Sequence, residues 1–86
     1  MPGMLARDGD GHLYQARAVG RQRSDGTWIG WLEFRPRAGR VIVRRTGRET
    51  TQANRLALRY WALGLDEVYL DGALVRAALE SRSQAS

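Results

Sequence analysis

The sequence predicts an α+β domain. In it, a three-stranded antiparallel meander packs on one face against a long helix, followed by a second helix or by a short strand plus a helix. Three observations predict this fold. Residues 12–45 contain stretches rich in aromatic and β-branched residues, separated by turn signals. Residues 46–64 combine a helix-start signal, helically spaced apolar residues and a terminal glycine. Residues 67–81 follow an aspartate and are again rich in apolar residues.

The first two strands are predicted at residues 12–23 and 27–35, and the second of these is rich in aromatic and β-branched residues. The Asp-Gly pair between them leaves two registers open. A three-residue loop with Gly26 in the left-handed region pairs Ala16 with Phe34, whereas a two-residue turn sets arginines opposite aromatic residues. We predict the three-residue loop, because cross-strand pairs of like character stabilise a sheet.

The third strand is predicted at residues 40–45, after a four-residue loop. This loop would pair Phe34 with Val41 and Leu32 with Val43, so that one face of the meander is apolar. The first helix would pack against this core face. The predicted members of the core face are Ala16, Ala18, Trp28, Leu32, Phe34, Val41 and Val43.

The first helix is expected to begin at the capping-box spacing of residues 46–49, with Thr50 or Thr51 as alternative N-caps. Gly64 is placed to end it. Its apolar residues span an arc too wide for the sheet alone to cover. Because Asn54 lies inside that arc, we expect its amide to be buried and to bind a neighbouring loop.

The second helix is predicted at residues 67–81, with Asp66 as its cap. Gly72 argues against a regular helix, so a short strand at residues 68–70 is the alternative. The apolar residues of this segment lie nearly all round a helix, which indicates burial on more than one side. We therefore predict a homodimer that buries this helix.

One domain is expected at residues 12–81, between a flexible segment at residues 1–11 and a frayed tail at residues 82–86. The chain of 86 residues has no cysteine and one histidine, so thiol nucleophiles and most histidine metal sites are excluded. All 14 basic residues are arginine, and nine acidic residues leave a net charge of +5. This charge indicates either attraction to polyanions or the codon bias of a GC-rich genome.

We expect no catalytic residue, metal or cofactor. The carboxylates of Asp25, Asp66, Glu67 and Asp71 fall at predicted turns or caps, where local hydrogen bonds account for them. Residues 8–11 (DGDG) begin like a calcium loop but lack its later ligands. No signal peptide or membrane span is visible, so a cytoplasmic protein without a membrane partner is expected.

The second face of the meander mixes arginine with aromatic and aliphatic residues. Trp31 and Ile29 would anchor a protein interface, or Trp31 would stack on bases while arginines hold phosphates. In the alternative without a ligand, Arg17 pairs with Glu33 and Arg44 stacks on Trp31. We predict a non-catalytic protein-interaction or self-associating module, with RNA or DNA binding as the alternative. The candidate interaction face consists of Trp31, Ile29, Ile42, Val19, Arg17, Arg21 and Arg44.

Three segments carry a resemblance to a known family: residues 28–34 (WIGWLEF), 48–55 (RETTQANR) and 60–65 (YWALGL). Together they resemble a family of small bacterial proteins that share a domain of unknown function. The resemblance covers about residues 13–79. It implies a bacterial source and a single domain, and it implies no activity, substrate or site residue.

Overall fold

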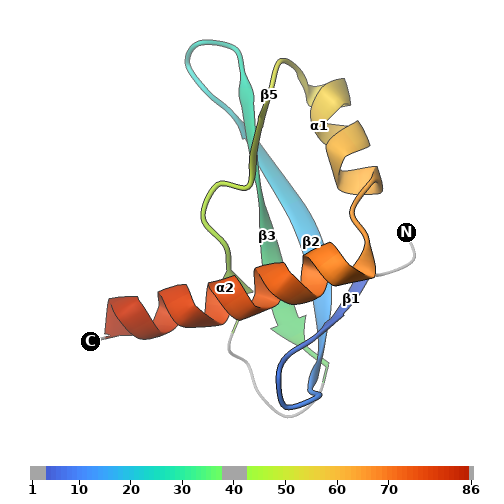
Figure 1. Ribbon diagram of the computed structural model, residues 1–86. Coiled ribbons are helices and arrows are strands. Elements are labelled where there is room, and N and C mark those ends of the chain that lie inside the picture. The colour runs from blue at the N-terminus through green and yellow to red at the C-terminus, as the bar shows by residue number, and fades with distance from the viewer. Residues whose placement is uncertain (1–3, 38–42, 86) are drawn as a thin grey trace.

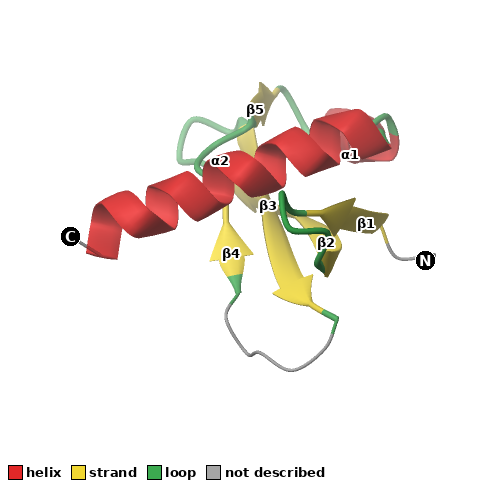
Figure 2. Ribbon diagram, turned by 60° about the horizontal axis from the view of Figure 1, so that its bottom comes forward, coloured by secondary structure: helices red, strands yellow, loops and turns green. Residues whose placement is uncertain are grey.

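The computed structural model describes residues 4–37 and 43–85 and has an α+β fold. An antiparallel sheet runs from β1 to β4, β5 joins β3 on the same edge as β4, and two C-terminal helices pack on the sheet (Figure 1, Figure 2). The predicted fold class is therefore confirmed. The elements are β1 (Met4–Arg7), β2 (Leu13–Gln22), β3 (Trp28–Pro36), β4 (Arg44–Arg45), β5 (Thr50–Gln52), α1 (Arg55–Leu63) and α2 (Glu67–Ala85).

The hairpin of β2 and β3 has the predicted register. Ala16 pairs with Phe34, and both side chains lie in the core. The N–H of Arg23 donates to the carbonyl of Thr27 over 2.7 Å, which closes a three-residue loop. Gly26 in this loop has φ +90°, a conformation that side chains rarely adopt. The turn residues thus set which side chains of the hairpin face the helices.

The N-terminal segment, expected to be flexible, contains β1, which pairs antiparallel with β2. Ala6 of β1 is 1% exposed and belongs to the core. The turn after β1 is held by Asp8, whose Oδ1 accepts from the N–H groups of Asp10 and His12 at 3.0 and 2.9 Å. The sequence lacked a strand signal here because β1 is only four residues long.

The third predicted strand is displaced by three residues along β3, so its predicted register is wrong. Phe34 pairs with Arg44 rather than with Val41. Because side chains alternate along a strand, an odd displacement exchanges its two faces. Arg44 therefore lies on the helix side of the sheet, and Val43, predicted in the core, is 40% exposed. Val41 and Ile42 lie outside the described residues.

Thr46 accounts for this displacement. Its side chain is buried, its N–H donates to the Leu32 carbonyl over 2.9 Å, and its Oγ1 accepts from the Leu32 N–H over 3.0 Å. A bulge of residues 47–49 then stands opposite Trp31, and the chain returns to the edge of β3 as β5. The helix start predicted in this segment, including its two alternative threonine caps, is therefore wrong. Residues 50–52 instead form a strand, β5, that pairs with the free edge of β3.

Helix α1 begins at Arg55, with Asn54 as its N-cap. The Asn54 side chain is exposed, and its Oδ1 accepts from the Ala57 N–H over 2.8 Å. The prediction that this amide is buried against a loop is therefore wrong, because the helix starts later and its apolar arc is shorter. The helix ends at Leu63, and Gly64 is its C-cap as predicted.

Two glycines let α1 approach the sheet closely. Gly20 and Gly30 face each other across β2 and β3. A β-carbon on Gly30 would lie 2.7 Å from Leu58 Cδ1 and 3.1 Å from Trp61 Cζ3, and one on Gly20 would overlap Leu58. This glycine pair forms a shallow seat for Leu58 on the core face.

Helix α2 lies across the same face of the sheet. Asp66 caps it as predicted, accepting from the Tyr69 N–H over 2.8 Å, and the alternative strand at residues 68–70 is excluded. The helix continues to Ala85, where a frayed tail was expected. It is not long and apolar enough to cross a membrane, and neither is α1.

The core is built from one stripe of α2 and one face of the sheet. Residues of α2 at positions i, i+3, i+4 and i+7 are at most 3% exposed. The opposite side of α2 is also apolar, but Val68, Val75 and Leu79 are 82%, 46% and 55% exposed. The core cluster consists of Ala6, Tyr14, Ala16, Leu32, Phe34, Leu70, Ala73, Leu74 and Ala77.

Candidate interaction surface

One face of the sheet is not covered by either helix. Both helices contact the face that carries the glycine pair and the core residues, so the opposite face is open within residues 4–37 and 43–85 (Figure 2). We call this the open face. Arg44 lies on the helix side instead, and the position of Ile42 is not described. Five of the seven predicted interaction residues share the open face: Arg17, Val19, Arg21, Ile29 and Trp31.

Trp31 lies at the centre of the open face and is half-buried. The guanidinium of Arg45 lies 4.5 Å from the centroid of the Trp31 ring. The prediction that Arg44 stacks on this ring is therefore wrong by one residue. The indole Nε1 of Trp31 donates to Glu33 Oε2 over 3.5 Å. Glu33 also forms the predicted ion pair with Arg17, with 3.8 Å between Oε1 and Nη2. Trp31 is thus held between polar partners rather than fully exposed.

The open face is strongly basic. Among the described strand residues whose register places them on it, Glu33 is the one carboxylate. The other described carboxylates lie in turns, in the bulge, or in α2 and its cap. Among the described strand residues, this face therefore carries five arginines against one carboxylate. The arginines on this face are Arg7, Arg17, Arg21, Arg35 and Arg45.

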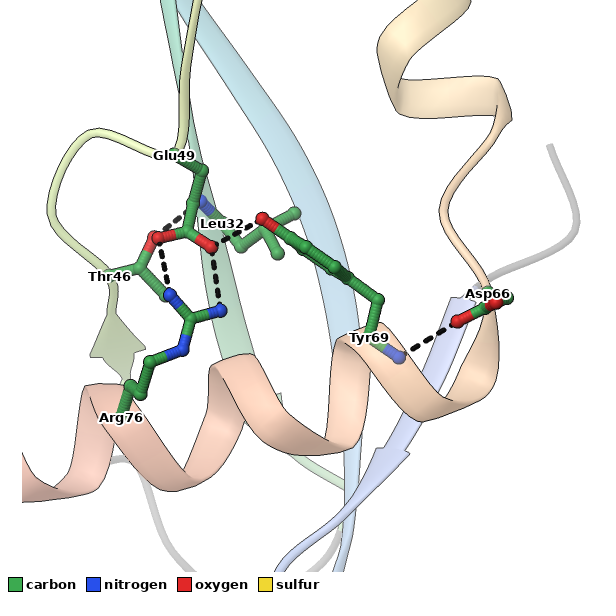
Figure 3. Close-up of polar contacts among 6 residues, drawn as sticks. All are labelled: Leu32, Thr46, Glu49, Asp66, Tyr69 and Arg76. Carbon is green, nitrogen blue, oxygen red and sulfur yellow. Dashed lines mark hydrogen bonds and ion pairs between the residues drawn. The ribbon is translucent and has the colours of Figure 1, made fainter.

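A second polar cluster lies on the helix side, where the bulge meets α2 (Figure 3). Glu49 accepts from both terminal nitrogens of Arg76, at 3.0 and 2.8 Å, and from the Tyr69 hydroxyl at 2.7 Å. We call these three residues the Glu49 cluster. The side chain of Glu49 is only 7% exposed, whereas that of Arg76 is 53% exposed. The cluster therefore ties the bulge to α2 through a nearly buried carboxylate.

Two pKa values are shifted in the Glu49 cluster. Burial, and then the hydrogen bond to Glu49, raise the pKa of the Tyr69 phenol. The hydrogen bonds to Glu49 raise the pKa of the Arg76 guanidinium, against an opposing effect of burial. Sequence reasoning missed this cluster, because its members are 20 and 27 residues apart and no local pattern joins them.

The remaining carboxylates named from the sequence have structural partners, except Glu67, which has no ion pair among the described residues. Hydrogen bonds from the Thr27 hydroxyl and N–H lower the pKa of Asp25. Asp66 caps α2, and Asp71 lies inside α2, where Oδ1 accepts from the Arg7 N–H over 2.9 Å. The predicted turn or cap position of Asp71 is therefore wrong, but it too binds a backbone donor.

The turn after β1 brings Asp8, Asp10 and His12 close together, with potential ligand atoms within 4.8 Å of one another. Burial would raise the pKa of Asp8, but hydrogen bonds from the His12 and Asp10 backbone N–H groups outweigh it and lower the pKa. Asp8 Oδ2 also lies 3.2 Å from His12 Nδ1. Because these bonds already engage both oxygens of Asp8, the group is explained as a turn.

A pocket of about 440 Å³ lies beside the Glu49 cluster. The acidic residue among its described lining residues, Glu49, is already engaged by Arg76 and Tyr69. The described lining of the pocket therefore offers a substrate no uncommitted carboxylate for proton transfer. It is lined by Thr46, Gly47, Arg48, Glu49, Arg76 and Leu79.

Comparisons of the chain with protein-family models, with curated proteins and with solved structures give no match. The resemblance to a bacterial family noted above therefore stays a prediction.

Proposed function

We propose that this protein is a non-catalytic binding module that binds single-stranded nucleic acid on the open face. The observation that carries the proposal is the charge of that face, which five arginines share with Trp31 and on which Glu33 is the one described carboxylate. Arginine binds phosphate through a planar fork of donors, and an aromatic ring can stack on any unpaired base.

The spacing of the arginines suits an extended strand of phosphates. Arg17 and Arg21 lie on the same face of β2, four residues apart, which corresponds to about 13 Å along a strand. Arg45 lies across β3 from them, on the Trp31 ring. A single strand crossing this face would meet cations on both sides of Trp31. A duplex would instead call for a protruding helix or ribbon to enter its groove.

A protein partner on this face was the preferred sequence-based prediction, with Trp31 and Ile29 as anchors. Both side chains are half-buried, and Arg45 covers the ring of Trp31. The exposed part of the open face is therefore more cationic than apolar, which supports a polyanion over an apolar protein surface. Leu5 and Leu13 are 40% and 36% exposed on this face, whereas the most exposed apolar residues, such as Tyr60 and Val68, lie on the helices.

The test is fluorescence anisotropy with a labelled, mixed-sequence single-stranded RNA of about 15 nucleotides, and with the matching DNA. We expect the logarithm of the affinity to fall with the logarithm of the salt concentration, with a slope of about −0.7 for each phosphate contacted. In this proposal a base takes the place of the Arg45 guanidinium on the Trp31 ring, and Trp31→Ala should weaken binding by about tenfold or more through lost stacking.

Two charge reversals distinguish binding on the open face from a general effect of net charge. Arg21 lies on the open face and Arg48 lines the pocket on the helix side. Arg21→Glu and Arg48→Glu change the net charge by the same amount. We expect the first to weaken binding far more than the second. Equal effects, or no binding at about 50 mM salt, would overturn the proposal. Equally strong binding of polyglutamate would indicate an acidic protein partner instead.

A further inference from the structure

Helix α1 has an apolar outer side that nothing in the described part of the chain covers. Leu56, Tyr60 and Leu63 are 59%, 65% and 61% exposed, and no residue of α1 is fully buried. Their spacing of i, i+4 and i+7 places them in one line along the helix. The inner side of α1 is the one that contacts the sheet, through Leu58 and Trp61.

We propose that a second copy of this chain docks on this line of residues, so that the two α1 helices pack antiparallel about a two-fold axis. This inference is independent of the proposed nucleic-acid binding. The line is self-complementary, because an antiparallel pair centred between Arg59 and Tyr60 sets Leu56 of one copy against Leu63 of the other. A two-fold interface requires such a match, since both copies offer the same surface.

The charges at the two ends of α1 also match in this arrangement. Arg55 is the first residue of α1, and the first turn has no acidic residue to balance the positive end of the helix dipole. Asp66 and Glu67 follow shortly after the helix ends. An antiparallel pair brings Arg55 of each copy towards the acidic pair of the other. Neither Arg55 nor Glu67 has an ion pair within the described residues.

The size of the surface limits the strength of this dimer. Three exposed side chains on a nine-residue helix supply only part of the roughly 800 Å² per partner that stable complexes bury. We therefore expect dissociation in the micromolar range. The sequence-based prediction placed the dimer on the second helix instead, where Val68, Val75 and Leu79 are also exposed. The two helices give two distinguishable interfaces.

Analytical ultracentrifugation without nucleic acid, from ~1 μM to ~1 mM protein, tests the proposal. We expect the wild type to shift from monomer to dimer within this range. Tyr60→Glu should raise the dissociation constant at least about 30-fold, as expected for a central anchor. Val75→Glu on α2 is the matched control, since it introduces the same charge on an exposed apolar position, and it should dimerise like the wild type.

A charge exchange tests the orientation of the two helices. Arg55→Glu and Glu67→Arg should each weaken the dimer, and the double variant should recover most of the loss. Circular dichroism confirms that each variant remains folded. A wild type that is monomeric throughout overturns the proposal. So does dissociation by Val75→Glu but not by Tyr60→Glu, which would return the interface to α2. Failure of the double variant to recover would overturn the antiparallel pairing.

Discussion

The Glu49 cluster predicts that its two charged members contribute unequally to stability. In the Glu49→Ala variant, Arg76 and the Tyr69 hydroxyl lose their acceptor, but both side chains are exposed enough to bind water. The loss is then the net value of solvent-screened hydrogen bonds, about 1–2 kcal/mol. In the Arg76→Ala variant, a carboxylate that is only 7% exposed keeps a single donor among the described residues, the Tyr69 hydroxyl. Stranding a nearly buried charge costs more, about 3 kcal/mol.

Urea unfolding followed by tryptophan fluorescence measures both losses, since a domain of this size has a total stability of roughly 4–13 kcal/mol. Tyr69→Phe is the control, because it removes one hydrogen bond and leaves the ion pair, and it should cost about 1 kcal/mol. The Glu49→Ala, Arg76→Ala double variant should cost less than the sum of the single losses. If Glu49→Ala destabilises the protein as much as Arg76→Ala, the carboxylate is not shielded and the reasoning fails.

Three further predictions follow from the packing and the pKa shifts. Thr46→Val leaves the buried Leu32 N–H without its side-chain acceptor and should lower the free energy of unfolding by about 1–3 kcal/mol. Thermal or urea unfolding measures this loss. A loss near zero would exclude that hydrogen bond as a stabilising contact. Gly30→Ala should lower the free energy of unfolding by about 1–2 kcal/mol, because the new methyl group overpacks against Leu58. The loss should be measurably smaller when Leu58→Ala is also present. Equal losses in both backgrounds would contradict the close approach of α1 to the sheet. Because the pKa of Tyr69 is raised in the folded state, the phenol's contribution to stability is fully present below its unfolded pKa of about 10 and is lost as the pH rises above that value. When unfolding is measured at high pH, the Tyr69→Phe variant should therefore lose less stability than the wild type.

The hairpin of β2 and β3 could be predicted from sequence because its register depends on local chemistry. The placement of Gly26 in the left-handed region and the pairing of Ala16 with Phe34 follow from one turn. The same reasoning placed Trp31 and its neighbours on one face correctly. What it could not supply was their exposure, which depends on the Arg45 side chain that covers the ring.

The edge of β3 could not be predicted in the same way. Apolar alternation favoured Val41 and Val43 as partners, but the observed register depends on the Thr46 side chain and on a bulge that no turn motif announces. The same bulge carries Glu49, whose partners lie more than 19 residues away. A capping-box spacing at this position was a false signal, because threonine favours strands as well as helix caps.

The bulge at residues 47–49 has a consequence for how the protein behaves in a crowded solution. It divides the outer edge of the sheet into pieces of two and three residues, β4 and β5. A continuous edge would offer an unbroken row of backbone donors and acceptors on which other chains could polymerise. Because the bulge interrupts this edge of the sheet, the edge is a poor template for pairing with strands of other chains. Shortening the bulge would join β4 and β5 into one longer edge strand and would promote aggregation.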